Sequence, residues 1–173
     1  MPSSYQAPNR GSKESSETRS QSADTNTAKS DTTVAQVLSQ KGNEIYSVRP
    51  QSTLADVVAM LKDKKIGALL VRDADGGLQG ILSERDIVRK LSEHGKDGLS
   101  LTAEETMTKN VQTCHADDTL LDVLRAMTGG RFRHMPVMNG TDLAGLITIG
   151  DMVSHRLKEL ELEALQLKQL IVG

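Results

Sequence analysis

The sequence predicts an α/β protein in which two β-α-β-β-α units pack about a pseudo-two-fold axis, between a disordered N-terminal tail and a long C-terminal helix. Three observations predict this fold: an internal repeat, short apolar strands alternating with one-sided helices inside each repeat, and an aliphatic composition. Of the 173 residues, 37% are hydrophobic but only 2% are aromatic. The core must therefore be built from Leu, Val, Ile, Met and Ala.

The repeat consists of three pairs of matching segments. Residues 53–58 match residues 119–124, which lie 66 positions later, and residues 65–71 match residues 131–137 at the same offset. Residues 80–86 match residues 145–151 at an offset of 65, so one residue is lost in the intervening turn, where deletions are best tolerated. Two units are too few for a solenoid, and each alone would expose one face of a small sheet. Face-to-face pairing of the units is therefore expected.

Each unit is expected to contain the same elements in the same order. The expected strands are 45–49, 66–71 and 78–82 in the first unit and 110–114, 135–138 and 143–147 in the second. A helix follows Thr53 and Thr119, each a cap hydroxyl with an acid three residues later, and a second helix starts near Ser83 and Thr148. We assign 34–100 to the first domain and 101–155 to the second.

The last helix continues to about residue 171 without Gly or Pro. Beyond the repeat, in residues 156–173, its apolar side chains are spaced by three and four positions, as in a coiled-coil seam. They are Leu157, Leu160, Ala164, Leu167 and Ile171. A helix lying on its own domain is the alternative, but the seam extends past the repeated unit and favours a homodimer contact.

Residues 1–33 form a polar segment in which 13 residues are Ser or Thr and four acids balance four bases. Such a segment buries too little apolar surface to offset its ordering entropy, so we expect a disordered tail. It has no apolar stretch typical of a secretory signal, and its acids argue against an organelle transit peptide. The cytoplasm is the expected compartment.

Composition excludes several classes of function. A net charge of −2 and a pI of about 6.1 argue against a nucleic-acid-binding surface, and no apolar run approaches the ~20 residues that span a membrane. The single cysteine, Cys114, excludes an internal disulfide and a cysteine-based zinc cage, and the four histidines show no ligand spacing. Serine elbows, P-loops and paired catalytic acids are absent from the sequence. We therefore expect no catalytic residues and no metal ligands.

A short motif occurs once in each unit, where a strand ends and a helix begins. It consists of Gly80, Ser83 and Asp86 in the first unit and Gly145, Thr148 and Asp151 in the second. At such a junction the hydroxyl and nearby amides can donate to a phosphate, and the carboxylate can accept from two ribose hydroxyls. A hydroxyl three residues before an acid is also a simple helix cap. Two copies in a duplicated unit favour a binding role, and the two roles are compatible.

These motifs, together with residues 133–137, resemble a CBS domain pair, or Bateman module, over residues ~34–155, in particular small stand-alone bacterial-type proteins. The resemblance implies an adenosine-containing ligand in the cleft between the units: AMP, ADP or ATP, with NAD(H) or S-adenosylmethionine as alternatives. It implies that Asp86 and Asp151 hold ribose and that Ser83 and Thr148 contact phosphate.

By position, Arg133 and His134 resemble basic residues that reach phosphates in the nucleotide-sensing subunit of AMP-activated protein kinase. The first unit has Gly67 and Ala68 there, so the two clefts are not expected to be used equally. We expect Arg133 and His134 to share the stronger cleft with Thr148 and Asp151. Arg85 is either a cation for the other cleft or a solvated helix residue.

The sequence thus predicts a non-catalytic, nucleotide-binding regulatory module whose ligand shifts the orientation of the units or the dimer contact, with a regulated partner protein as a further binding candidate. The main alternative is a ligand-free interaction module in which the hydroxyl–acid pairs only cap helices. The sequence is also compatible with an enzyme subunit separated from its catalytic partner and with a redox partner that uses Cys114.

Overall fold

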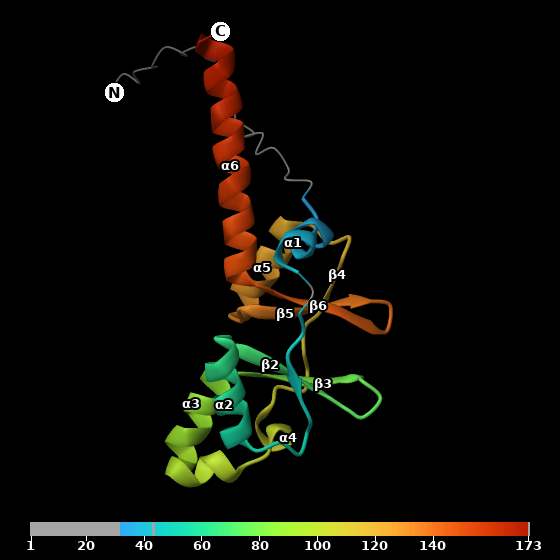
Figure 1. Ribbon diagram of the computed structural model, residues 1–173, viewed down its shortest axis with the longest axis vertical. Helices are drawn as coiled ribbons and strands as arrows, with labels where there is room; N and C mark the ends of the chain where they lie inside the picture. The colour runs from blue at the N-terminus through green and yellow to red at the C-terminus, as the bar shows by residue number, and fades with distance from the viewer. Residues whose placement is uncertain (1–31, 43, 173) are drawn as a thin grey trace, which may run out of the picture.

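The computed structural model describes residues 32–42 and 44–172, and side chains as far as residue 171. Within these residues, two three-stranded sheets lie at the centre and the helices lie outside them (Figure 1). The first unit contains β1 (Ser47–Val48), α2 (Leu54–Lys64), β2 (Ala68–Arg72), β3 (Leu78–Ser83), α3 (Glu84–His94) and the 3-10 helix η1 (Gly95–Ser100). The second contains β4 (Cys114–His115), α5 (Leu120–Gly130), β5 (His134–Asn139), β6 (Asp142–Thr148) and α6 (Ile149–Val172). Helices α1 (Val34–Lys41) and α4 (Ala103–Thr106) precede the respective units.

The predicted β-α-β-β-α order is confirmed in both units. Each sheet has a parallel pair followed by an antiparallel hairpin, in the orders β1-β2-β3 and β4-β5-β6. The predicted caps also form, because the Thr53 and Thr119 hydroxyls accept hydrogen bonds from the backbone N–H groups of Asp56 and Asp122, both at 3.2 Å. The second hairpin turns at Gly140, whose φ of +61° lies in the left-handed region that glycine adopts without strain.

The short helix that precedes each unit packs in the core of the other unit. From α1, the side chains of Val34, Val37 and Leu38 are buried with those of the second unit. From α4, Ala103 is buried in the core of the first unit. The two units are therefore joined by exchanged helices, and neither core is complete without a segment from outside its own repeat.

Matching backbone hydrogen bonds fix both exchanged helices. The Val34 N–H donates to the Asp118 carbonyl at 2.9 Å, and the Ala103 N–H donates to the Ser52 carbonyl at 2.8 Å. In the reverse direction, Leu120 N–H donates to the Thr32 carbonyl and Leu54 N–H to the Leu101 carbonyl, both at 2.8 Å. These equivalent bonds give the pair its pseudo-two-fold arrangement.

The predicted tail, residues 1–33, lies outside the described residues except for its last two. Thr32 and Thr33 belong to the folded part, where Thr33 forms a β-bridge with Thr119 and the Thr32 hydroxyl donates to Glu159 of α6. Among the described helices, none is long and apolar enough to cross a membrane.

Candidate functional site

A cavity of about 480 Å³ lies between the two units, within the volume range of small-ligand sites. The first unit contributes β3 and the start of α3, and the second contributes the end of α5, the start of β5 and the segment before β4. Five of the nine predicted site residues line it: Ser83, Arg85, Asp86, Arg133 and His134.

Ser83 and Asp86 form a complete cap at the start of α3. The Ser83 backbone N–H and hydroxyl both donate to Asp86 Oδ2, at 2.9 and 2.7 Å. Asp86 Oδ1 accepts from Arg89 at 3.0 Å, and the residue is only 8% exposed. A carboxylate has about four acceptor positions, so Asp86 retains acceptor capacity toward a ligand hydroxyl. The Ser83 hydroxyl, however, must leave Asp86 before it can donate to a phosphate.

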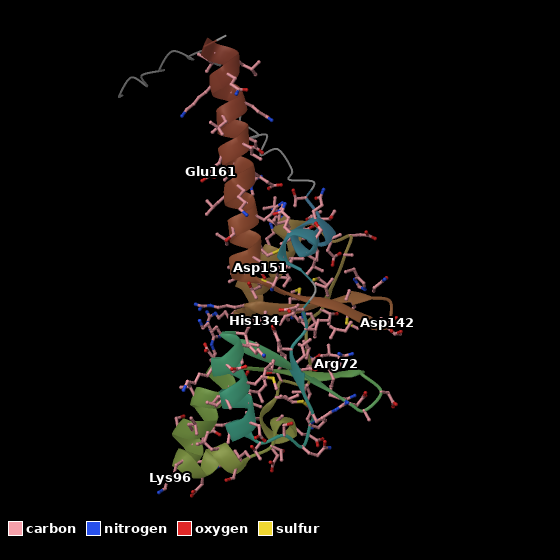
Figure 2. All side chains as sticks on the ribbon, in the orientation of Figure 1. Arg72, Lys96, His134, Asp142, Asp151 and Glu161 are labelled. Atoms are coloured by element: carbon pink, nitrogen blue, oxygen red, sulfur yellow. The ribbon has the colours of Figure 1, made fainter. Side chains whose placement is uncertain are left out.

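His134 reaches across the junction between the units, where Gly67 leaves room for it (Figure 2). A Cβ at position 67 would lie 3.4 Å from His134 Nε2, so the small residue in the first unit accommodates the larger one in the second. Burial lowers the pKa of His134 below its usual 6.5, and the nearby Lys41 lowers it further. The carboxylates of Asp151 and Glu84 oppose this shift in part, but the pKa of His134 stays lowered and the side chain is biased toward its neutral form.

The cavity carries an excess of positive charge. Four guanidinium groups line it, against two carboxylates, even before His134 is counted. They belong to Arg85, Arg89, Arg131 and Arg133. Arg85 also connects the units, since its Nη1 donates to the carbonyl of Arg131 at 2.9 Å. This charge balance and the forked geometry of guanidinium groups suit an anionic ligand such as a phosphate.

The second copy of the motif is arranged differently. The Thr148 N–H donates to Asp151 Oδ2 at 2.9 Å, and the Asp151 N–H donates to the Thr148 hydroxyl at 3.1 Å. Lys41, the last residue of α1, brings its ammonium within 2.6 Å of the same Oδ2 and donates to the Leu146 carbonyl at 2.9 Å. Burial by itself raises the pKa of Asp151, but the bonds from Lys41 and Thr148 outweigh it and the pKa lies below its usual value.

The two motif glycines provide room for protein neighbours. A Cβ at Gly80 would lie 2.5 Å from the sulfur of Met107 and 2.9 Å from the Thr108 carbonyl oxygen. A Cβ at Gly145 would lie 3.1 Å from the side chain of Leu38. At both positions the approaching groups belong to the segments that exchange between the units.

The sequence predicted that Arg133 and His134 share a cleft with Thr148 and Asp151, but this cavity groups them with the motif of the first unit instead. Arg133 and His134 line it together with Ser83 and Asp86, whereas Thr148 and Asp151 are not among its lining residues. The reason lies in the register: Thr148 pairs with His134 across the hairpin, while the loop before β5 extends toward the start of α3. The structure thus places the basic pair of one unit beside the hydroxyl–acid motif of the other.

Three residues of functional interest were missed by the sequence reasoning. Arg89 and Arg131 line the cavity, and Lys41 engages Asp151. The i, i+3 spacing of Asp86 and Arg89 on one helix could have indicated that Arg89 lies beside Asp86 and therefore close to the site. Nothing local could identify Lys41, because its contact depends on the exchange of α1.

The remaining candidates stay structural. Cys114 is buried, and burial raises the pKa of its thiol to about 12, so it is a poor nucleophile. Within residues 32–42 and 44–172, no group of three His, Cys, Asp or Glu side chains could hold a metal ion.

Comparison with known proteins gives the family. The model of the CBS domain matches residues 34–93 and again residues 103–158. The chain belongs to the CBS-domain family. CBS-domain proteins are in general regulatory or signal-transduction modules, and this chain is a small CBS pair.

Individual relatives agree with this assignment. A solved CBS-domain containing protein from Agrobacterium tumefaciens is 40% identical to this chain in sequence. The two structures match with a TM-score of 0.71, and the match covers 73% of this chain and 94% of that one. The mitochondrial CBS domain-containing protein CBSX3 from Arabidopsis thaliana is 29% identical over 82% of this chain and 73% of its own length. CBSX2, solved in complex with AMP, shares the fold at 23% identity and a TM-score of 0.62, over 73% of this chain and 97% of that one.

Proposed function

We propose that this CBS pair is a non-catalytic sensor that binds an adenine nucleotide in the 480 Å³ cavity between its units. AMP, ADP and ATP are the favoured ligands, and NAD(H) and S-adenosylmethionine are the remaining adenosine-containing candidates. The observation that carries the proposal is the composition of the cavity. A hydroxyl–acid motif from one unit and a basic pair from the other face one space, as a sugar-phosphate ligand requires.

In this proposal, the second unit binds phosphate and the first binds the sugar. Arg133 and His134 supply the cation and a donor for the phosphate, and Asp86 accepts from the ribose hydroxyls. The aromatic ring of Phe132, which also lines the cavity, offers an apolar surface for the base. Each bond to a charged group contributes about 1.5–3 kcal/mol, so a few such bonds account for micromolar binding.

The motif of Thr148 and Asp151 is proposed as the weaker of two sites. A ribose that binds Asp151 must compete with the Lys41 ammonium, 2.6 Å from the carboxylate. Gly145, the third member of this motif, faces Leu38 of α1, so α1 must adjust if a ligand is to approach there. Two features therefore support stronger binding at the first motif than at the second. Lys41 competes for Asp151 in the second motif, and Arg133 and His134 lie beside the first.

The alternative function is an interaction module without a ligand. It is favoured by one observation: both motif acids are already engaged in capping their own helices, Asp86 with Ser83 and Asp151 with Thr148. Arg85 and Arg89 have partners within the protein, the Arg131 carbonyl and Asp86. Helix capping and docking alone do not account for the excess of four guanidinium groups over two carboxylates around one hollow. The cavity therefore favours the nucleotide sensor.

Regulation would proceed through helix α6, which starts directly after Thr148 and extends well beyond the body (Figure 1). We propose that two copies associate through the exposed part of this helix, and that the ligand changes this contact or the docking of a regulated partner protein. A ligand acts only through different affinities for two states. The cytoplasm remains the expected compartment.

A thermal-shift panel with AMP, ADP, ATP, NAD(H) and S-adenosylmethionine tests the proposal. Ligand at 100 times its Kd stabilises the protein by about 2.7 kcal/mol, which corresponds to roughly 5–10 °C for a folded part of this size. Arg133→Ala is expected to reduce the shift strongly. Arg125→Ala is the matched control, because Arg125 lies exposed on α5 and does not line the cavity. No shift with any ligand favours the interaction module instead.

A further inference from the structure

Helix α6 carries a continuous apolar stripe that stays exposed in the part of the chain that the structure describes. The side chains are spaced by four and three residues alternately, as at positions a and d of a heptad repeat. They are Val153, Leu157, Leu160, Ala164, Leu167 and Ile171. The exposed fractions of the five large side chains run from 44% for Val153 and Leu160 to 84% for Ile171. The helix projects from the body, with Glu161 about halfway along it (Figure 2).

The stripe differs from the face that holds α6 to its own body. Met152 is fully buried in the second core, and Glu159 interacts with Thr32, His155 and Arg156. At 100° per residue, the centre of the stripe lies roughly 100° around the helix from this anchoring face. A second helix can therefore lie along the stripe without displacing α1 or α5.

Charged residues flank the stripe in an order that selects one arrangement. With Leu157 and Ala164 at position a, Arg156 and Glu163 occupy g, and Glu161 and Lys168 occupy e. In a parallel coiled coil, each g residue faces the e residue five positions later in the other helix. Arg156, which also pairs with Glu159 and Glu163 of its own helix at 3.1 and 3.7 Å, then faces Glu161 of the second copy, and Glu163 faces Lys168 of the second copy. Both pairs are attractive, and two-fold symmetry doubles them.

We infer that α6 pairs with α6 of a second copy as a parallel, in-register coiled coil from Val153 to Ile171. This inference rests on the self-association proposed above and specifies its surface and direction. An antiparallel pairing that used the whole stripe would place Glu161 opposite Glu161 and Glu163 opposite Glu163. Like charges at these positions oppose association, so charge selects the parallel form.

The dimensions of the stripe suit a modest, reversible contact. It extends over about 28 Å of helix, which is fewer than three heptads. The body already holds the first turns of α6 in helical form, which removes the cost of helix nucleation. Residues 1–31 are a poor alternative occupant, because their apolar side chains are few, namely Met1, Tyr5, Ala7, Ala23 and Ala28.

Cysteine cross-linking of the full chain tests the direction and register. In the parallel coil, Ala164 faces Ala164 of the second copy, so Ala164→Cys is expected to form a disulfide-linked dimer under mild oxidation. Leu162→Cys is the matched control, because Leu162 is 60% exposed and points away from the stripe. The native Cys114 is buried, so it contributes no background.

Analytical ultracentrifugation of unmodified chain and charge variants completes the experiment. Lys168→Glu is expected to weaken the dimer roughly tenfold, and adding Glu163→Lys is expected to restore it. A dimer that cross-links through position 162 as readily as through 164, or that ignores the charge changes, overturns the parallel coil but leaves self-association standing. A chain that stays monomeric up to ~100 μM overturns both. Neither result affects nucleotide binding, which the thermal-shift panel measures separately.

Discussion

Replacing Lys41 tests how strongly its ammonium group holds Asp151, the acid of the second motif. Its ammonium lies 2.6 Å from Asp151 Oδ2 and 2.9 Å from the Leu146 carbonyl oxygen, and the two side chains are 31% and 24% exposed. A partly exposed ion pair contributes about 0.2–1 kcal/mol, and the second bond adds a similar amount. Lys41→Met is therefore expected to lower the free energy of unfolding by about 1 kcal/mol, or Tm by roughly 2–4 °C.

The pH dependence identifies the ion pair as the cause. The pKa of Asp151 is lowered in the folded state, so its stabilisation is present above the unfolded value of about 4 and is lost as pH falls through the folded value. Urea unfolding of wild type and Lys41→Met is expected to differ at pH 7 and to converge toward pH 3. Lys158→Met, at an exposed lysine on α6, is the control and is expected to change stability by less than about 0.5 kcal/mol. A difference that is the same at both pH values would refute the ion-pair explanation.

The same variant has a binding readout. Because a ribose at Asp151 must displace Lys41, removing about 1 kcal/mol of competition is expected to strengthen binding at the second motif by roughly fivefold. Calorimetric titration with AMP measures this as a second, tighter binding event. Weaker binding in Lys41→Met would instead mean that Lys41 itself contacts the ligand.

The geometry of the site leads to three further predictions. Asp86→Asn is expected to weaken nucleotide binding at least about tenfold in calorimetry while the protein stays folded, and unchanged affinity would remove Asp86 from the site. Because its pKa is lowered, His134 is biased toward its neutral form and is expected to take up a proton when a phosphate binds beside it. The affinity for the nucleotide is therefore expected to rise from pH 8 to pH 6 in wild type, and to rise less in His134→Gln. Equal slopes of affinity against pH in the two proteins would exclude His134 as the group that takes up the proton. Gly80→Ala is expected to cost about 1–3 kcal/mol in urea unfolding, because its Cβ would lie 2.9 Å from the Thr108 carbonyl, whereas Gly145→Ala meets only a flexible side chain and costs less. Equal costs would contradict the packing explanation.

The repeated elements were predictable because they depend on neighbouring residues. The Thr53 and Thr119 caps and the helix starts after Ser83 and Thr148 all follow from local spacing, and the structure confirms each. Duplication helped as well, since one unit predicted the content of the other.

The exchange of helices could not be predicted, and the grouping of the site depends on it. No local pattern around Val34 or Ala103 indicates that these helices pack in the opposite unit. The same long-range arrangement brings Lys41 to Asp151. The position of His134 over Gly67 also depends on how the two units meet, which hydropathy periodicity within one unit does not encode.

A crystal structure with AMP at saturating concentration examines the nucleotide sensor most directly. The expected result is one nucleotide in the cavity, with its phosphate within hydrogen-bond distance of Arg133 or His134 and its ribose beside Asp86. A nucleotide bound elsewhere on the chain, or a cavity that holds only solvent at saturating AMP, would contradict the assignment.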